Sequence, residues 1–195
     1  MKFLDLSDPG AHTVIVNFPG RPESSEDESV SHLGFEGKYK IIGETVREKW
    51  IGFIGCSQVH ENEAIIHHTE ACLEELQEKT KDRMVLLLGT SAGAGGILAS
   101  VKARKLATGM ILLNTNPFNV WKENVENWVH QFERWLDFYN GFEDFPGHIS
   151  WTERITKEAR TQKIRHDMIH GQHRLTAEQV IPAILASLRR HNFIE

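Results

Sequence analysis

The sequence predicts an α/β fold in three layers, a mostly parallel sheet flanked by helices. Short apolar runs alternate with longer amphipathic segments between residues 13 and 114, which is the pattern of strand–helix–strand units. The runs at residues 84–88 and 110–114 are apolar at almost every position, as expected of strands buried on both faces of a parallel sheet. A glycine-rich turn joins the first of these runs to a helix.

The predicted elements of this region alternate in type, and each is bounded by turn residues or by a helix cap. In chain order they are strands at residues 13–18 and 50–54, a helix at 62–81, a strand at 84–88, a helix at 97–107 and a strand at 110–114. A final helix is predicted at residues 176–190, because Thr176 can cap it and its apolar residues share one face.

The segment between these regions carries a dense aromatic pattern. Large apolar residues recur at alternating steps of four and three, which predicts one long helix over residues 119–140. We expect this helix to pack on the core of the domain. The alternatives are a helical lid or cap insertion over residues 119–145, or a homodimer face formed by Trp121, Trp128 and Trp135.

Length and composition bound the class of protein. The 195 residues, 40% hydrophobic and 25% charged, suit a single α/β domain over residues 1–195. The formal net charge of −5 argues against a nucleic-acid partner, and the apolar runs are too short for a membrane span. Only two cysteines, Cys56 and Cys72, and no apolar signal segment predict a cytoplasmic protein.

The glycine-rich turn contains the motif Gly89-x-Ser91-x-Gly93 between a predicted strand and a predicted helix. A serine nucleophile needs this spacing because the turn that lifts its hydroxyl above the sheet has no room for side chains two residues to either side. The N–H of Ala92 then lies at a helix N-terminus, where it can stabilise an oxyanion. The motif predicts Ser91 as a nucleophile on an elbow formed by Gly89 and Gly93.

The same turn also has the spacing Gly89-x-x-x-Gly93-x-Gly95 of a dinucleotide-binding loop. An NAD(P)-binding Rossmann-type protein is therefore an alternative, and a purely structural turn is another. Two observations disfavour nucleotide binding. The turn follows at least two predicted strands instead of the first one, and neither Tyr39 nor Tyr139 has a lysine four residues later.

From residue 13 to about residue 118, the order and spacing of the elements around Ser91 resemble the α/β-hydrolase superfamily. The resemblance implies a serine, an acid and a histidine in that chain order, with the histidine in the loop before the last helix. His173 in Gly171-Gln172-His173 fits this place as the general base. By the same resemblance, an N–H from Gly20 or Arg21 would join the oxyanion hole.

The implied function is hydrolysis of an ester or thioester through an acyl-enzyme, on a small-molecule acyl substrate and without a cofactor. Asp144, 29 residues before His173 by the sequence numbers, is the first choice for the acid. Its surroundings, residues 141–146, do not look like the end of a strand, so Glu143 and Asp167 remain alternatives. His170 is an alternative base.

A second alignment places residues 169–171 in the penultimate strand of the superfamily. The last strand and its histidine would then be missing, and the protein would be a catalytically inactive α/β-hydrolase-like protein used for binding or assembly. The length of 195 residues bears on the choice between the two alignments. We expect fewer strands than usual, with the missing ones at the N-terminus and between residues 147 and 170, or else an incomplete triad.

A metal site is not expected. His166, His170 and His173 are close in sequence, but Gly171 would break any helix that aligned them, and no cysteine or nearby glutamate completes a ligand set.

Overall fold

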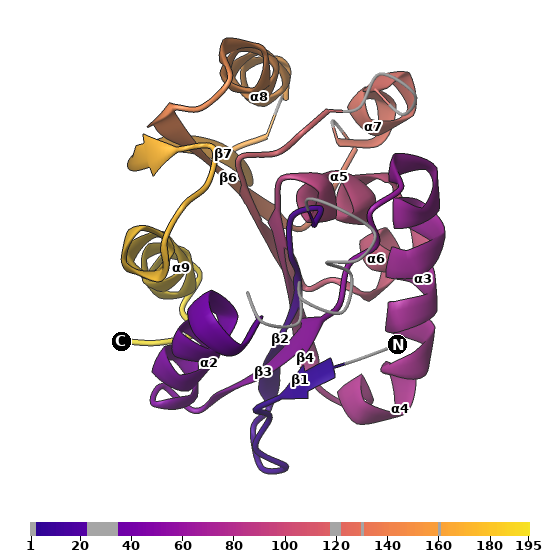
Figure 1. Cartoon of the computed structure of the whole chain (residues 1–195), viewed down its shortest axis with the longest axis vertical. Coiled ribbons are helices and arrows are strands. Elements are labelled where there is room, and N and C mark those ends of the chain that lie inside the picture. The colour runs from indigo at the N-terminus through magenta and orange to yellow at the C-terminus, as the bar shows by residue number, and fades with distance from the viewer. Residues whose placement is uncertain (1–2, 23–34, 118–121, 130, 160) are drawn as a thin grey trace.

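The computed structural model describes residues 3–22, 35–117, 122–129, 131–159 and 161–195. A seven-stranded sheet lies between two layers of helices (Figure 1). The predicted α/β architecture with a mostly parallel sheet is confirmed. Within the described residues, no helix is both long and apolar enough to cross a bilayer.

The strands share one order and, with a single exception, one direction. They are β1 (Phe3–Asp5), β2 (Thr13–Phe18), β3 (Ile51–Cys56), β4 (Met84–Thr90), β5 (Gly109–Leu113), β6 (Trp135–Glu143) and β7 (Ile164–Gln172). The spatial order is β1-β3-β2-β4-β5-β6-β7, and only β1 runs antiparallel to its neighbour. The carboxyl ends of β2 to β7 therefore lie at the same edge of the sheet.

The helices divide between the two faces of the sheet (Figure 1). One face carries η2 (Phe35–Tyr39), α2 (Lys40–Arg47) and α9 (Ala177–Arg190). The other carries η3 (Asn62–Ala64), α3 (Ile65–Glu75), α4 (Gln77–Thr80), α5 (Ala92–Ala99), α6 (Val101–Leu106), α7 (Lys122–Val129) and α8 (Pro146–Glu158).

Two hydrophobic cores result because successive strand residues point to opposite faces. In β4, Val85 and Leu87 pack beneath α3 and α5, whereas Leu86 and Leu88 pack beneath α2 and α9. All four side chains are buried. This double burial explains why the strand is apolar at successive positions.

Most of the predicted elements are present. The expected helix at 62–81 consists of η3, α3 and α4. The helix expected at 97–107 begins earlier, at Ala92, and is divided into α5 and α6 by Ser100, which caps the second. The last helix begins after Thr176, whose side chain forms a capping box with Gln179. The sequence patterns did not predict the short β1, η2, α2, α8 or β7.

The prediction of one long helix over residues 119–140 is wrong. Residues 122–129 form α7, but Trp135–Glu143 is strand β6, paired on both sides in the sheet. The aromatic residues of this segment suit a strand as well as a helix, and a strand buried on both faces shows no polar alternation that would reveal its period. The helical cap over 119–145 therefore does not form as one helix.

The two described tryptophans of the proposed dimer face, Trp128 and Trp135, lie on opposite faces of the sheet. Trp128 packs edge-on against Phe132 in the core beneath α7. Trp135 stacks on His191 at the opposite face, with ring centroids 4.0 Å apart. Trp121 lies outside the described residues. The helical stripe on which the homodimer hypothesis depended is absent from the part of the chain that is described.

Candidate active site

Three polar side chains meet at the carboxyl edge of the sheet, each directly after a different parallel strand. Ser91 follows β4, Asp144 follows β6 and His173 follows β7. The Oγ of Ser91 lies 2.8 Å from Nε2 of His173, and Nδ1 of His173 lies 2.6 Å from Oδ1 of Asp144. The structure thus brings together the three residues that the sequence analysis ranked first.

The backbone at Ser91 has the strained conformation expected of a nucleophile elbow, with φ 51° and ψ −114°. The flanking glycines are required by packing. A Cβ atom on Gly93 would lie 2.2 Å from the carbonyl oxygen of Phe18, and one on Gly89 would lie 2.6 Å from Cα of Ala94. Ala92 is the first residue of α5, so its N–H has no partner within the helix.

Hydrogen bonds surround the carboxylate of Asp144. Its Oδ1 accepts from the Nδ1–H of His173 and from the backbone N–H of Phe145, and its Oδ2 accepts from Asn140. Burial raises the pKa of Asp144, but hydrogen bonds from His148, His173, Asn140 and the Phe145 backbone outweigh it and hold the pKa well below its usual value. The carboxylate therefore stays ionised.

This ionised acceptor sets the tautomer of His173. Because a carboxylate only accepts, Nδ1 of His173 carries the proton, and Nε2 of the neutral ring is left with a lone pair toward Ser91. The Ser91 hydroxyl then donates to this lone pair. The arrangement is that of a serine activated by an oriented base.

Asn114, which sequence analysis did not single out, fixes the loop that carries His173. Its Nδ2 donates to the carbonyl oxygens of Gln172 and His173, at 3.0 and 2.7 Å, and its Oδ1 accepts from the N–H of Gly141. The residue is fully buried and has φ 46°, a conformation that asparagine tolerates better than most residues. An asparagine directly after an apolar strand is the signal that could have revealed it.

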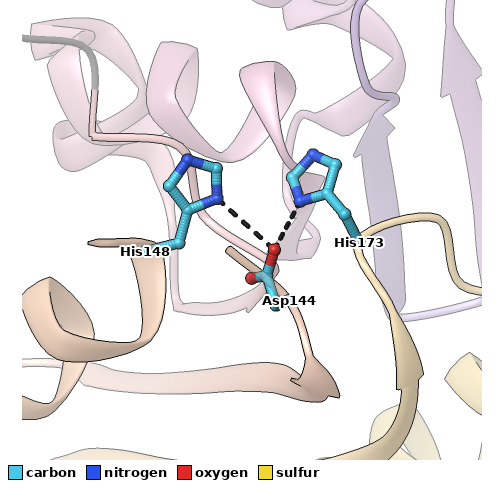
Figure 2. A group of neighbouring side chains, drawn as sticks. All are labelled: Asp144, His148 and His173. Atoms are coloured by element: carbon cyan, nitrogen blue, oxygen red, sulfur yellow. Dashed lines mark hydrogen bonds and ion pairs between the residues drawn. The ribbon is translucent and has the colours of Figure 1, made fainter. Parts of the chain in front are cut away.

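A second imidazole flanks the acid. Nδ1 of His148, on the first turn of α8, lies 3.5 Å from the same Oδ1 of Asp144 that His173 contacts. Figure 2 shows both rings on either side of the carboxylate, each with a nitrogen directed toward it. The sequence patterns did not predict that His148 lies beside Asp144.

The remaining candidates lie elsewhere. His170 is exposed and contacts the ring of Phe142, and Asp167 pairs with Arg190 on α9. Glu143 is exposed at the end of β6. Residues 141–143 are the last residues of β6, so the expectation that residues 141–146 are not the end of a strand was wrong. The alternative alignment around residues 169–171 left no strand and no histidine after the acid, whereas here β7 and then His173 follow Asp144 and His173 contacts it.

A cavity of about 550 Å³ opens beside Ser91. Gly20, proposed for the oxyanion hole, lines it next to the nucleophile: a Cβ on Gly20 would lie 3.5 Å from Cβ of Ser91. Three cationic residues, Arg21, Lys38 and Arg174, also line the cavity, and no Asp or Glu is found among its described lining residues.

Comparisons with known proteins place this geometry in a known fold. Neither a protein-family model nor a curated protein matches the sequence. Solved structures do match. A predicted CIB-like hydrolase from Thermoplasma acidophilum is 13% identical, with a TM-score of 0.70 over 96% of this chain and 91% of that one.

Two further structures match at similar levels. The monoacylglycerol lipase of Paleococcus ferrophilus is 12% identical, with a TM-score of 0.67 over 97% of this chain and 98% of that one. An esterase domain from Rhodothermus marinus is 12% identical, with a TM-score of 0.71 over the same shares. At these identities the likeness establishes the fold, which is α/β-hydrolase-like with seven strands.

Proposed function

We propose that the protein is a serine hydrolase that cleaves an ester or thioester through an acyl-enzyme. The observation that carries the proposal is the chain of hydrogen bonds from Ser91 through His173 to the buried Asp144, at 2.8 and 2.6 Å. The solved structures with this fold include proteins described as an esterase and a monoacylglycerol lipase, which agrees with that chemistry.

The first half-reaction follows from the tautomer of His173. Ser91 Oγ attacks the carbonyl carbon of the substrate while its proton passes to Nε2 of His173. The imidazolium that forms is stabilised by the Asp144 carboxylate at Nδ1. The tetrahedral intermediate collapses, the leaving alkoxide or thiolate takes the Nε2 proton, and the acyl group remains on Ser91.

The second half-reaction repeats these steps with water. Water gives a proton to Nε2 and attacks the acyl carbon, and Ser91 leaves with that proton as the free hydroxyl. In both halves, negative charge develops on the carbonyl oxygen. We assign its stabilisation to the N–H of Ala92 at the start of α5, with the N–H of Gly20 as second donor.

The packing of the turn favours serine chemistry over a dinucleotide. In a pyrophosphate-binding loop, glycines leave room for the ligand. Here the space beside Gly93 is filled by the backbone of Phe18 and Pro19, and that beside Gly89 by Ala94. Both glycines are therefore explained by contacts within the chain.

The charge of the cavity points to the kind of substrate. The chain has a net charge of −5, yet the described lining of the cavity holds three cations and no carboxylate. Such a site attracts anions. We infer an acyl ester or thioester that carries a carboxylate or phosphate group.

The proposal is tested by the hydrolysis of short-chain p-nitrophenyl esters and acyl thioesters. Ser91→Ala should reduce turnover to the rate without protein, whereas Ser150→Ala, on the exposed surface of α8, should leave it unchanged. Equal turnover by the wild type and Ser91→Ala would overturn the proposal.

A further inference from the structure

The second histidine beside the acid has no place in the proposed reaction. Nδ1 of His148 is buried, and its contact with Oδ1 of Asp144 is long for a hydrogen bond, at 3.5 Å. The two imidazole rings lie close together, with centroids 5.2 Å apart and planes tilted by 58°. A buried ring nitrogen with only so long a contact is poorly satisfied, which raises the question of what it could bind.

The three side chains converge in the manner of metal ligands. One oxygen of Asp144, Nδ1 of His148 and a ring nitrogen of His173 all lie within 4.8 Å of one another. Asp144 and His148 are four residues apart around the start of α8, and His173 comes from the loop after β7. Figure 2 shows both rings with a nitrogen directed at the carboxylate.

The distances are close to those of a zinc site. A tetrahedral Zn²⁺ with bonds of about 2.1 Å places neighbouring ligand atoms about 3.4 Å apart. The His148–Asp144 pair already has this separation, at 3.5 Å. Nδ1 of His173 and Oδ1 of Asp144 are 2.6 Å apart and would have to separate by about 0.8 Å. This is roughly the difference between the length of a hydrogen bond and the distance between two ligand atoms of one metal ion.

We propose that Asp144, His148 and His173 bind a divalent transition-metal ion, Zn²⁺ in the first instance, and that the bound ion blocks the serine. Two imidazoles and one carboxylate form a ligand set that suits Zn²⁺ and similar transition-metal ions, whereas Mg²⁺ and Ca²⁺ prefer oxygen ligands. This set differs from the one of His166, His170 and His173 considered from the sequence.

The blocking effect rests on the proposed function and follows from proton positions. When Nδ1 of His173 binds the metal, its proton moves through solvent to Nε2, so the number of protons on the ring is unchanged. Nε2 then has no lone pair for the proton of Ser91. Metal binding and activation of the serine exclude each other at this one imidazole.

Binding is tested first, without reference to activity. The purified chain is freed of metal with a chelator and titrated with ZnCl₂ by calorimetry, and with CoCl₂ by visible absorption. We expect one ion per chain, bound at least tenfold more weakly by His148→Ala. The exposed His170→Ala is the matched control, because it removes one histidine outside the cluster, and it should bind as the wild type does.

His148→Gln serves if the alanine variant does not fold by circular dichroism. Binding by the folded His148 variant that is as tight as in the wild type would overturn the inference. The inference would also be overturned if His170→Ala weakened zinc binding as much as His148→Ala does, because that would indicate several weak sites on the surface.

The consequence for the serine is measured separately, as the rate at which a fluorophosphonate labels Ser91 with and without Zn²⁺. We expect labelling of the wild type to slow at least tenfold at saturating Zn²⁺, and that of His148→Ala to be affected at least tenfold less at the same concentration. Unchanged labelling with zinc bound would overturn the blocking role. No labelling of the metal-free wild type would overturn the proposed function and leave the binding result standing.

Discussion

Replacing Gly93 with alanine tests whether the turn that carries Ser91 is packed as described. The new Cβ would lie 2.2 Å from the carbonyl oxygen of Phe18 and 2.4 Å from that of Pro19. Ordinary contacts of this kind exceed 3.0 Å, so the gap between the end of β2 and the start of α5 must open by about 1 Å. Both obstructing atoms belong to the backbone, which has little freedom to move.

The size of the effect follows from the cost of overpacking. Inserting a methyl group into a close-packed site costs about 1–3 kcal/mol, and the rigid surroundings of Gly93 place it at about 2–3 kcal/mol. For a domain of this length, each kcal/mol lowers Tm by about 2–4 °C, so we expect a fall of about 4–12 °C. Because the shift also moves Gly20 relative to Ser91, hydrolysis should fall about 100-fold.

Thermal unfolding followed by circular dichroism measures the first effect, and ester hydrolysis by the folded variant measures the second. Gly147→Ala is the matched control: Gly147 is exposed in the first turn of α8, and a Cβ there would meet no atom within 4 Å. It should keep or raise Tm, because alanine favours helix over glycine by up to about 1 kcal/mol. A Gly93→Ala protein as stable as the wild type would refute the described packing.

Four further results are expected. Asp144→Asn should lower kcat by about 10⁴-fold, because an amide no longer selects the reactive tautomer of His173; full activity would contradict the role of the acid. The pKa of Asp144 is lowered in the folded state, so its ionisation stabilises the fold fully when the pH is above the ordinary value of 3.8. This stabilisation is lost as the pH falls below that value. The difference in unfolding free energy between the wild type and Asp144→Asn, measured with urea, should therefore shrink below about pH 4. Asn114→Ala should lower the free energy of unfolding in urea by at least about 2 kcal/mol, since the buried N–H of Gly141 loses its acceptor. An unchanged urea midpoint would contradict this role of Asn114. Arg174→Ala should raise KM for an anionic ester about two- to fivefold more than for a neutral one. Equal changes in the two KM values would contradict the inference that the cavity binds an anionic substrate.

The sequence predicted the site well where the chemistry depends on local spacing. Gly89, Ser91 and Gly93 stand in the order that a strained turn between a strand and a helix requires, and this turn is what the structure contains. The position of His173 before a capped helix could also be predicted, because Thr176 marks the start of that helix.

The parts that failed depend on tertiary context. Trp135–Glu143 has a spacing of aromatics that suits a helix, but its neighbours β5 and β7 make it a strand. Because β6 was not recognised, Asp144 was not seen to lie at a strand end. Asn114 bonds to residues far along the chain, so its position after an apolar strand marks the residue but not its partners. His148 contacts Asp144 through the start of α8, a helix that the sequence patterns did not predict.

The expectation of fewer strands than usual is confirmed by the seven-stranded sheet. The expectation that a strand is missing between residues 147 and 170 is wrong, because β7 begins at Ile164, and a short strand, β1, is present at the N-terminus. A seven-stranded sheet is enough to hold Ser91, Asp144 and His173 at one edge, because all three follow strands that run in the same direction.

The most direct test of the central proposal is the covalent capture of Ser91. The intact mass of the wild-type chain is measured after reaction with a fluorophosphonate, and the modified peptide is sequenced by mass spectrometry. We predict one adduct per chain, on Ser91, absent from Ser91→Ala and formed far more slowly by a folded His173→Ala. An unmodified wild type across pH 6 to 9, or an adduct that persists in Ser91→Ala, would contradict the account.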